Sequence, residues 1–262
     1  MSTARSAFEV WNQKGETLTS VEAFIHDNYP MDRLAERGEG LFNINCSHFP
    51  WAVPAPGSVV MEVGSGVGYI LQAALRRTNP SRIVGLDVAA GMIEQAKKRL
   101  ARDNITDPRI EFLHYDGVTI PLPDNSVDFI YSMAVLQHIP RIYVYNLLTE
   151  LFRILKPSGY CSLQTFAFSQ LLQIPKESRK NVFSAEVAGQ VRDKEYAWIT
   201  YYSFEELLYV LSEGLGAKDI HIVERDGSLW FSFSKSGAKT FHYEWLPKLA
   251  HSAVRTQFEP ST

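Results

Sequence analysis

The segment Glu62-Val63-Gly64-Ser65-Gly66-Val67-Gly68 decides the fold, because it places three glycines between a short apolar run and a helix-like one. The run before it, Ser58 to Val63, is apolar and suits a buried parallel strand. The run after it, Tyr69 to Arg77, is predicted to be helical. Glycine at such a turn lets the backbone bend tightly and lets a ligand approach without meeting a Cβ atom. The segment therefore predicts a ligand-binding loop after the first strand of an α/β sheet.

The glycine spacing separates this loop from the dinucleotide-binding fingerprint. That fingerprint is G-x-G-x-x-G, and its loop holds a pyrophosphate at a helix N-terminus. Here the position of its last glycine is occupied by Tyr69, so the spacing is G-x-G-x-G. Glu62, two residues before the first glycine, is also unusual beside a phosphate site. Both features disfavour a NAD-dependent dehydrogenase.

Strand-like and helix-like segments alternate after the glycine loop, which predicts βαβ units and a mostly parallel sheet. The expected later strands of the parallel part are 82–88, 109–115, 127–132 and 160–168, and the expected helices are 90–103, 142–155 and 203–212. Two apolar runs, 218–224 and 229–234, flank Asp226-Gly227, a strong hairpin signal. We predict an α/β, Rossmann-like, doubly wound sheet of seven strands, with a C-terminal antiparallel hairpin and helices on both faces.

Three regions lie outside this regular pattern. Residues 1–57 end in a Pro-rich connector and are predicted to form an N-terminal helical cap, with helices at 21–26 and 30–37. Residues 58–235 form the expected main domain, in which 169–202 is a lid-like insertion. Residues 236–262 are assigned as a C-terminal tail.

Composition limits the functional classes. The net charge is −3 and no long basic run is present, which weighs against a dedicated nucleic-acid binder. The two cysteines, Cys46 and Cys161, make neither a disulfide framework nor a zinc pattern, so no metal is expected. The first residues lack the apolar core of a signal peptide, and no apolar run approaches about 20 residues. We expect a cytoplasmic protein that does not enter a membrane.

Several further segments occur in the order typical of one family. They are Val84–Asp87, Val88–Ala96, Tyr115–Gly117, Phe129–Ile139 and Leu155–Gly159. Together with the glycine loop, they resemble the motifs of class I S-adenosylmethionine (SAM)-dependent methyltransferases, of the small-molecule type found in ubiquinone and menaquinone biosynthesis. The resemblance covers residues 58–166. It implies that SAM is the cofactor and S-adenosylhomocysteine the product.

The resemblance also implies cofactor roles for individual residues. Asp87 would accept hydrogen bonds from the ribose hydroxyls and Asp116 from the adenine amino group, since carboxylates are strong acceptors. The other expected cofactor residues are Glu62, Gly64, Ser65, Gly66, Gly68, Val88, Met92, Gly117, Ser132 and Met133. Alternatives remain open for several of these. Asp87 would otherwise cap a helix, Asp116 would hold a turn, Glu62 would fix the loop, and Val88 and Met92 would be core.

Methyl transfer needs in-line positioning, and an oxygen or nitrogen acceptor also benefits from a base. His138, just after the fourth strand, is the expected catalytic base or substrate contact; its alternative is a helix-capping role. His114, within the third strand, is expected to be a packing residue. An aromatic lid would suit a small acceptor. Its expected residues are Trp11, Trp198, Tyr201 and Tyr202, which would otherwise pack the insertion onto the sheet.

Two rival functions remain open. The first is a methyltransferase acting on nucleic acid or protein. Those that methylate nucleic-acid amines commonly carry an Asn/Asp-Pro-Pro-Tyr/Phe segment after strand four, where this chain has Ser132-Met-Ala-Val135. A non-catalytic SAM-binding protein would keep the same cofactor motifs. We favour methyl transfer to the oxygen of a small molecule, on family frequency alone. The acceptor's identity and the choice between monomer and homodimer are not readable from the sequence.

Overall fold

The computed structural model describes residues 11–13, 15–16, 33–173, 190–191 and 199–246. Its helices are α3 (Leu34–His48), α4 (Tyr69–Thr78), α5 (Ala90–Arg102), α6 (Arg141–Ile154) and α9 (Phe204–Tyr209). Its strands are β1 (Val59–Val63), β2 (Arg82–Asp87), β3 (Ile110–His114), β4 (Val127–Ser132), β5 (Leu155–Ala167), β6 (Gln190–Val191), β7 (Ile199–Tyr202), β8 (Lys218–Arg225), β9 (Ser228–Ser234) and β10 (Phe241–Leu246). Short helical turns are η2 (Pro50–Ala52), η3 (Leu136–His138), η4 (Phe168–Gln173) and the π-helical turn η5 (Val210–Gly214).

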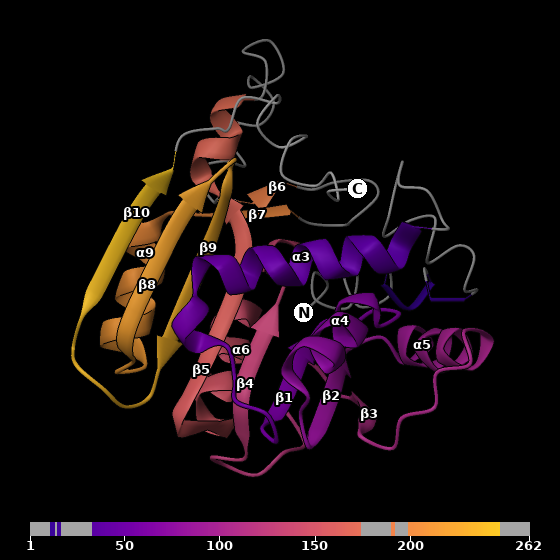
Figure 1. Ribbon diagram of the computed structural model, residues 1–262. Coiled ribbons are helices and arrows are strands. Elements are labelled where there is room, and N and C mark those ends of the chain that lie inside the picture. Colours follow the sequence, from indigo (N-terminus) through magenta and orange to yellow (C-terminus); the bar gives the residue numbers. More distant parts are fainter. Residues whose placement is uncertain (1–10, 14, 17–32, 174–189, 192–198, 247–262) are drawn as a thin grey trace, which may run out of the picture.

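The main sheet runs in the order β10-β8-β9-β5-β4-β1-β2-β3 (Figure 1). Strands β1 to β5 are parallel, while β9 is antiparallel to both β5 and β8. The expected α/β sheet and C-terminal hairpin are therefore confirmed. The strand count differs from the predicted seven, because β10 from the expected tail adds an eighth strand along β8. The short pair β6–β7 also joins the sheet, beside the end of β5.

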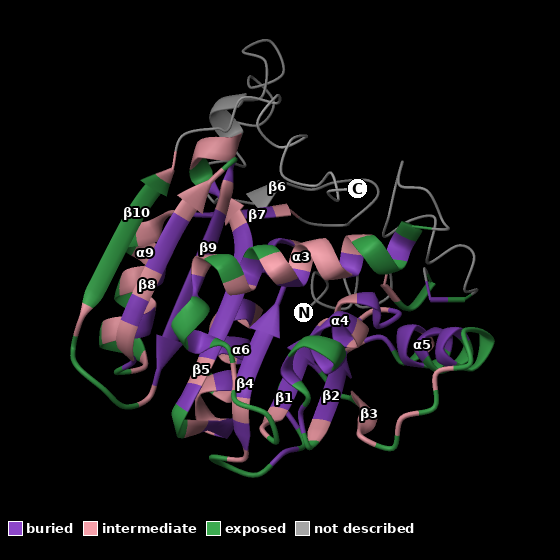
Figure 2. Cartoon of the chain, viewed as in Figure 1, coloured by how far each residue is buried: buried purple, intermediate pink, exposed green. Residues whose placement is uncertain are grey.

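Helices cover both faces of the sheet, and each face has its own apolar cluster. One cluster holds Leu148 of α6 and Leu207 of α9 against Ile130 of the sheet. The other holds Phe42 of α3 and Leu71 of α4 on the opposite face. Neighbouring strand residues alternate between the clusters, as the two-residue period of a strand requires. The buried residues follow the centre of the sheet from β2 to β9, while β10 is exposed (Figure 2).

The N-terminal helix differs from its prediction in a way that glycine explains. Helix α3 begins at Leu34 and continues to His48, past the expected end at 37. Glycines at 38 and 40 weaken a helix, so the sequence predicts an early end there. A Cβ atom at Gly38, however, would lie 2.5 Å from the Tyr69 carbonyl oxygen. The glycine thus lets α3 pack closely on the start of α4, and the expected helix at 21–26 lies outside the described residues.

In the described part of the chain, no helix combines the length and the apolar character needed to cross a bilayer.

Candidate active site

A cavity of about 530 Å³ lies at the carboxyl ends of the parallel strands. One group of lining residues comes from the glycine loop and the end of β2, namely Glu62, Gly64, Ser65, Gly66, Gly68, Asp87, Val88 and Met92. A second group comes from the N-terminal region, the segment after β4 and strands β5 and β9, including Trp11, Arg37, Gln137, His138, Tyr143, Phe166 and Trp230. Open α/β sheets bind ligands at this edge. The two groups share one cavity, so two molecules can meet there.

The glycine loop needs its glycines. Gly64, Gly66 and Gly68 all have positive φ angles, of 69°, 50° and 80°. A Cβ atom at Gly64 would lie 2.4 Å from Cγ2 of Val135, a residue that also lines the cavity. The Gly64 N–H donates to the Leu86 carbonyl at 2.7 Å, which ties the loop to the end of β2. The loop is therefore held close to two strand ends.

Arg99 is a residue whose position against the glycine loop the sequence did not reveal. Its side chain is fully buried on α5 and donates to the carbonyl oxygens of Val67 at 2.7 Å and Gly68 at 3.1 Å. Its guanidinium also donates to Gln72 and lies over the Tyr69 ring. These contacts join α5 to the glycine loop and the first turn of α4. An arginine in an amphipathic helix usually lies in solvent, so the helical pattern gave no signal of this role.

Asp87 points its carboxylate at the backbone beside the cavity. Its two oxygens accept from the N–H of Gly66 at 3.0 Å and from the N–H of Ala89 at 2.9 Å. Burial raises the pKa of this carboxyl above its ordinary value of 3.8, and the bonds from Ala89 and Gly66 oppose that rise. Each carboxylate oxygen retains further acceptor capacity. Asp87 thus joins the loop to α5 and also lines the cavity.

Glu62 is buried at the end of β1 and also lines the cavity. It accepts a hydrogen bond from the Tyr131 hydroxyl at 3.3 Å. Burial raises the pKa of Glu62 well above its ordinary value of 4.5, while the Tyr131 bond opposes the rise. A ligand cation in the cavity would lower this pKa again, because it favours the ionised form.

The Ser65 hydroxyl and the Gln137 side-chain oxygen are buried at the cavity and have no hydrogen-bond partner among the described residues. A buried polar group without a partner costs about 1–3 kcal/mol. Ser65 belongs to the glycine loop and Gln137 to η3. Each atom therefore has unused hydrogen-bonding capacity on a residue that lines the cavity.

Trp11 and His138 meet over the cavity. Their rings pack edge to face with centroids 5.5 Å apart. The N-terminal segment is held there by Gln95 of α5, which donates to the carbonyl oxygens of Gly15 at 3.0 Å and Glu16 at 3.2 Å. Trp11 and His138 therefore both line the cavity, although 127 residues separate them in the chain.

Comparisons with known proteins agree with this arrangement. Residues 61–163 match a family described as a methyltransferase domain. The resemblance of these residues to the SAM-dependent methyltransferases is thereby confirmed. A ubiquinone/menaquinone biosynthesis C-methyltransferase of Ruegeria sp. is 29% identical, with coverage of 60% of this chain and 68% of the relative. A malonyl-acyl-carrier-protein O-methyltransferase of Serratia marcescens is also 29% identical, over 52% of this chain and 47% of its own length.

Solved structures extend the likeness to the fold around the methyltransferase domain. Phosphoethanolamine N-methyltransferase 2 of Haemonchus contortus, solved in complex with SAM, superimposes with a TM-score of 0.59 at 19% identity. The superposition covers 82% of this chain and 45% of that one. The chain spans about half the length of several curated relatives that it matches, with 47% and 42% for two malonyl-acyl-carrier-protein O-methyltransferases. SAM is the cofactor of this family.

Most of the expected cofactor residues line the cavity, but two lie elsewhere. Gly117, Met133, Val88 and Met92 line it together with the glycine loop. The side chain of Asp116 is exposed and accepts from the backbone N–H of Val118 and Thr119, so the structure places it in a turn. Ser132 is buried and donates to the Val63 carbonyl at 2.9 Å, which links β4 to β1. Neither is among the described residues that line the cavity.

The expected acceptor residues of the insertion also differ. Tyr201 stacks on Phe166, with ring centroids 6.0 Å apart. Tyr202 is buried in the core beside α6, under the guanidinium of Arg141. Neither tyrosine is among the described lining residues, because β7 turns both toward the sheet and its helices. Trp198 lies outside the described residues. Tyr201 and Tyr202 therefore pack against the sheet and its helices, which is the alternative that the sequence left open for them.

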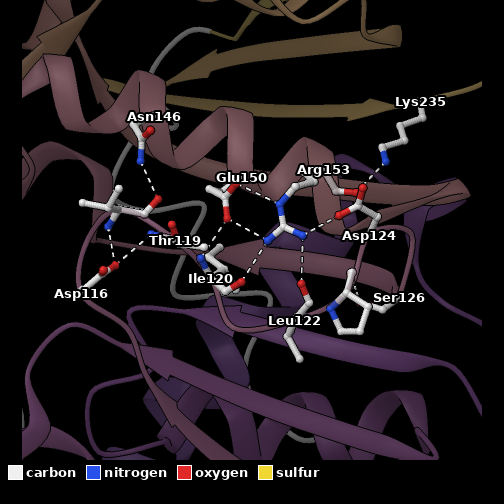
Figure 3. Close-up of polar contacts among 12 residues, drawn as sticks. Asp116, Thr119, Ile120, Leu122, Asp124, Ser126, Asn146, Glu150, Arg153 and Lys235 are labelled. Carbon is white, nitrogen blue, oxygen red and sulfur yellow. Dashed lines mark hydrogen bonds and ion pairs between the residues drawn. The ribbon is translucent and has the colours of Figure 1, made fainter.

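The loop between β3 and β4 is held in place by α6 (Figure 3). Arg153 donates to the carbonyl oxygens of Ile120 and Leu122, both at 2.9 Å, and pairs with Glu150 at 2.8 Å. Glu150 in turn accepts from the Ile120 N–H at 2.9 Å. The same loop carries Gly117 to the cavity. Helix α6 thus holds the loop that brings Gly117 to the cavity, and its own Tyr143 lines the cavity as well.

Proposed function

We propose that this chain transfers the methyl group of SAM to a small molecule bound beside His138, most specifically to an oxygen of that molecule. The observation that carries the proposal is the single cavity lined both by the glycine loop with Asp87 and by Trp11 with His138. The relatives include C- and O-methyltransferases, which supports transfer to a small molecule but leaves the acceptor atom open. The choice of oxygen rests on family frequency, and His138 offers the base from which such an acceptor would benefit.

The cofactor side of the cavity suits SAM, a cation without phosphates. Asp87 and Glu62 supply acceptors, and the Ser65 hydroxyl has no partner among the described residues. Gly64 has no side chain, so its backbone can approach the ligand closely. A Cβ atom at this position would meet the Val135 side chain. In this proposal Asp87 accepts from the ribose hydroxyls, while Val88 and Met92 flank the adenine. Bound SAM supplies an electrophilic methyl group with a neutral leaving group.

The adenine contact needs revision in this proposal. Asp116 already accepts two backbone hydrogen bonds from its own turn. Its neighbours Tyr115 and Gly117 line the cavity instead. We infer that Asp116 shapes the turn and that the backbone at Gly117 faces the adenine side. Asn146 and Arg153 of α6 hold this loop from outside.

The acceptor side is largely aromatic, with a few polar atoms. Trp11, Tyr143 and Phe166 supply apolar surface that would exclude water. Gln137 offers a side-chain oxygen that has no partner among the described residues, and such an atom accepts from a hydroxyl or amine. His138 is then the group within the cavity that takes the proton from the attacking oxygen. Orientation of the two molecules supplies the rest of the rate enhancement. In general, such orientation lowers the reaction barrier by about 7–11 kcal/mol.

The test is a methyl-transfer assay with radiolabelled SAM, first on a small-metabolite extract and then on fractions that retain label. His138→Ala should lower turnover with the isolated acceptor by about 100-fold and leave SAM affinity nearly unchanged, as expected for a base. His114→Ala is the matched comparison, since His114 lies at the end of β3 and bonds the Val88 carbonyl. Equal turnover of His138→Ala and the wild type would remove His138 from the mechanism. Label retained on RNA or protein alone would reject a small-molecule acceptor.

A further inference from the structure

The edge strand β10 exposes a row of aromatic side chains. Phe241, Tyr243 and Trp245 are 40%, 36% and 61% exposed, and they alternate with exposed His242 and Glu244. Among the described strands, β10 pairs only with β8, and it lies at the outer edge of the sheet in Figure 1. Figure 2 shows it exposed along its length. Natural edge strands usually carry lysine, proline or a bulge that blocks pairing. Residues 241–246 contain neither lysine nor proline.

The backbone of β10 has a defined set of outward groups. The Ile220 N–H donates to the Thr240 carbonyl, and the parallel register pairs Phe241 with Ile220. This register turns the N–H and C=O of His242 and Glu244 toward β8. Successive residues alternate, so the N–H and C=O of Phe241, Tyr243 and Trp245 point away from the sheet. Three residues therefore offer both a donor and an acceptor along the outer edge.

We propose that β10 pairs antiparallel with β10 of a second copy of this chain, about a two-fold axis at Tyr243. In this register Tyr243 lies opposite Tyr243 of the second copy. Phe241 lies opposite Trp245, and both are residues with outward backbone groups. The two strands then form hydrogen-bonded pairs at all three positions. Antiparallel aromatic pairs on one face add favourable contacts.

Side-chain charge selects this register over its neighbours. The pairing about Tyr243 sets His242 opposite Glu244 of the second copy, twice by symmetry. These are non-hydrogen-bonded pairs, in which side chains approach most closely. A shift by one step in either direction, which the outward groups also permit, sets His242 opposite His242 or Glu244 opposite Glu244. Two glutamates opposite each other repel, and two histidines opposite each other lack the carboxylate partner, so the register about Tyr243 is preferred.

The second copy is the occupant that the sequence of β10 itself specifies. A two-fold interface must be self-complementary. If one residue of the first copy meets a second residue of the other copy, then the second residue of the first copy meets the first residue of the other copy. Phe241–Leu246 meets that condition in both its aromatic pairs and its charged pairs. The strand is short, so the interface it makes is at the small end of specific interfaces. We expect a dimer that forms with increasing protein concentration.

Cysteine cross-linking reads the register directly. Hydrogen-bonded antiparallel partners have Cα atoms about 5.5 Å apart, which suits a disulfide. Tyr243→Cys should therefore form an intermolecular disulfide under mild oxidation. His242→Cys is the matched control. Residue 242 lies opposite residue 244 of the second copy, so the Cα atoms of the two copies of residue 242 are roughly 8 Å apart, which is beyond disulfide reach. Cross-linking of His242→Cys in place of Tyr243→Cys would overturn the register. Failure of both would overturn the interface.

Charge exchange provides a second test that does not require Tyr243, whose ring stacks on Phe204. Sedimentation velocity of the full chain over a concentration series should show a monomer–dimer equilibrium. His242→Glu should raise its dissociation constant about tenfold, because glutamates then face each other. The double variant His242→Glu/Glu244→Lys should restore it. A wild type that stays monomeric at every concentration, as when residues 247–262 cover β10, would overturn the proposal, and so would a double variant that fails to recover.

Discussion

Replacing Arg99 with methionine tests how the glycine loop is held. The fully buried guanidinium donates to the Val67 and Gly68 carbonyls and to Gln72, at 2.7, 3.1 and 2.9 Å. Methionine fills similar volume but donates no hydrogen bond. The two loop carbonyls then lose their charged donor, at about 1–3 kcal/mol each, so we expect a loss of about 3–5 kcal/mol in the free energy of unfolding. For a chain of this size, that corresponds to roughly 6–20 °C in Tm.

Arg102→Met is the matched control on the same helix. The Arg102 side chain is 48% exposed and pairs with Asp103 on the surface, so its loss should cost at most about 1 kcal/mol. Thermal unfolding and urea denaturation of the two variants would give the comparison. A titration with SAM should show weaker binding to Arg99→Met, because the loop is less ordered. If both variants unfold at the same temperature, Arg99 does not hold the loop and the reasoning is refuted.

Two further substitutions probe the walls of the site. Arg153→Met should lower stability by about 2–3 kcal/mol near neutral pH, through its bonds to the loop after β3 and its pair with Glu150. Arg153 lowers the pKa of Glu150 below its ordinary value of 4.5. The stabilisation from this pair is therefore fully present above pH 4.5 and is lost as the pH falls through the lowered pKa of Glu150. Urea titrations at several pH values check this, and a difference that grows on acidification would contradict it. Gly64→Ala should cost about 2–5 kcal/mol, since its Cβ would meet Val135 at a positive φ. Gly57→Ala, with φ of 84° and open space, carries only the backbone strain and should cost about 1–2 kcal/mol; equal Tm values would refute the steric argument.

Hydrophobic runs and glycine punctuation predicted most of the parallel sheet. Strand β4 has its expected bounds, and β1, β2 and β3 end within a residue or so of theirs. Strand β5 begins at Leu155, five residues earlier than expected. Proline and glycine at 157 and 159 indicate a turn, but the chain passes directly from α6 into the strand, and Leu155 already pairs with Val127. An irregularity in that pairing accommodates the unusual residues.

The site was predictable where function depends on backbone position, and less so where it depends on side-chain direction. Glycine permits the positive φ angles of the loop, so residue type indicated a tight turn at this position. Asp116 has the residue type for an adenine contact, yet its oxygen is satisfied by its own turn. For Arg99 the residue type suggested a solvent-exposed side chain, and nothing in the helix pattern indicates that its guanidinium is buried against the glycine loop. Such directions depend on packing between elements distant in the sequence.

The central claim is that this cavity binds SAM with Asp87 on the ribose. Isothermal titration of S-adenosylhomocysteine into the wild type, Asp87→Ala and Asp87→Asn tests it most directly. Asparagine keeps one acceptor oxygen, so it can accept from the backbone N–H of Gly66 or of Ala89 but not from both, and the thermal unfolding of each variant is measured alongside to separate lost folding from lost binding. We predict one bound molecule for each wild-type chain, and a loss of about 1.5–3 kcal/mol, roughly 10- to 150-fold, for the alanine variant, with asparagine intermediate. Equal affinity of all three folded proteins, or no binding to the wild type, would contradict the claim.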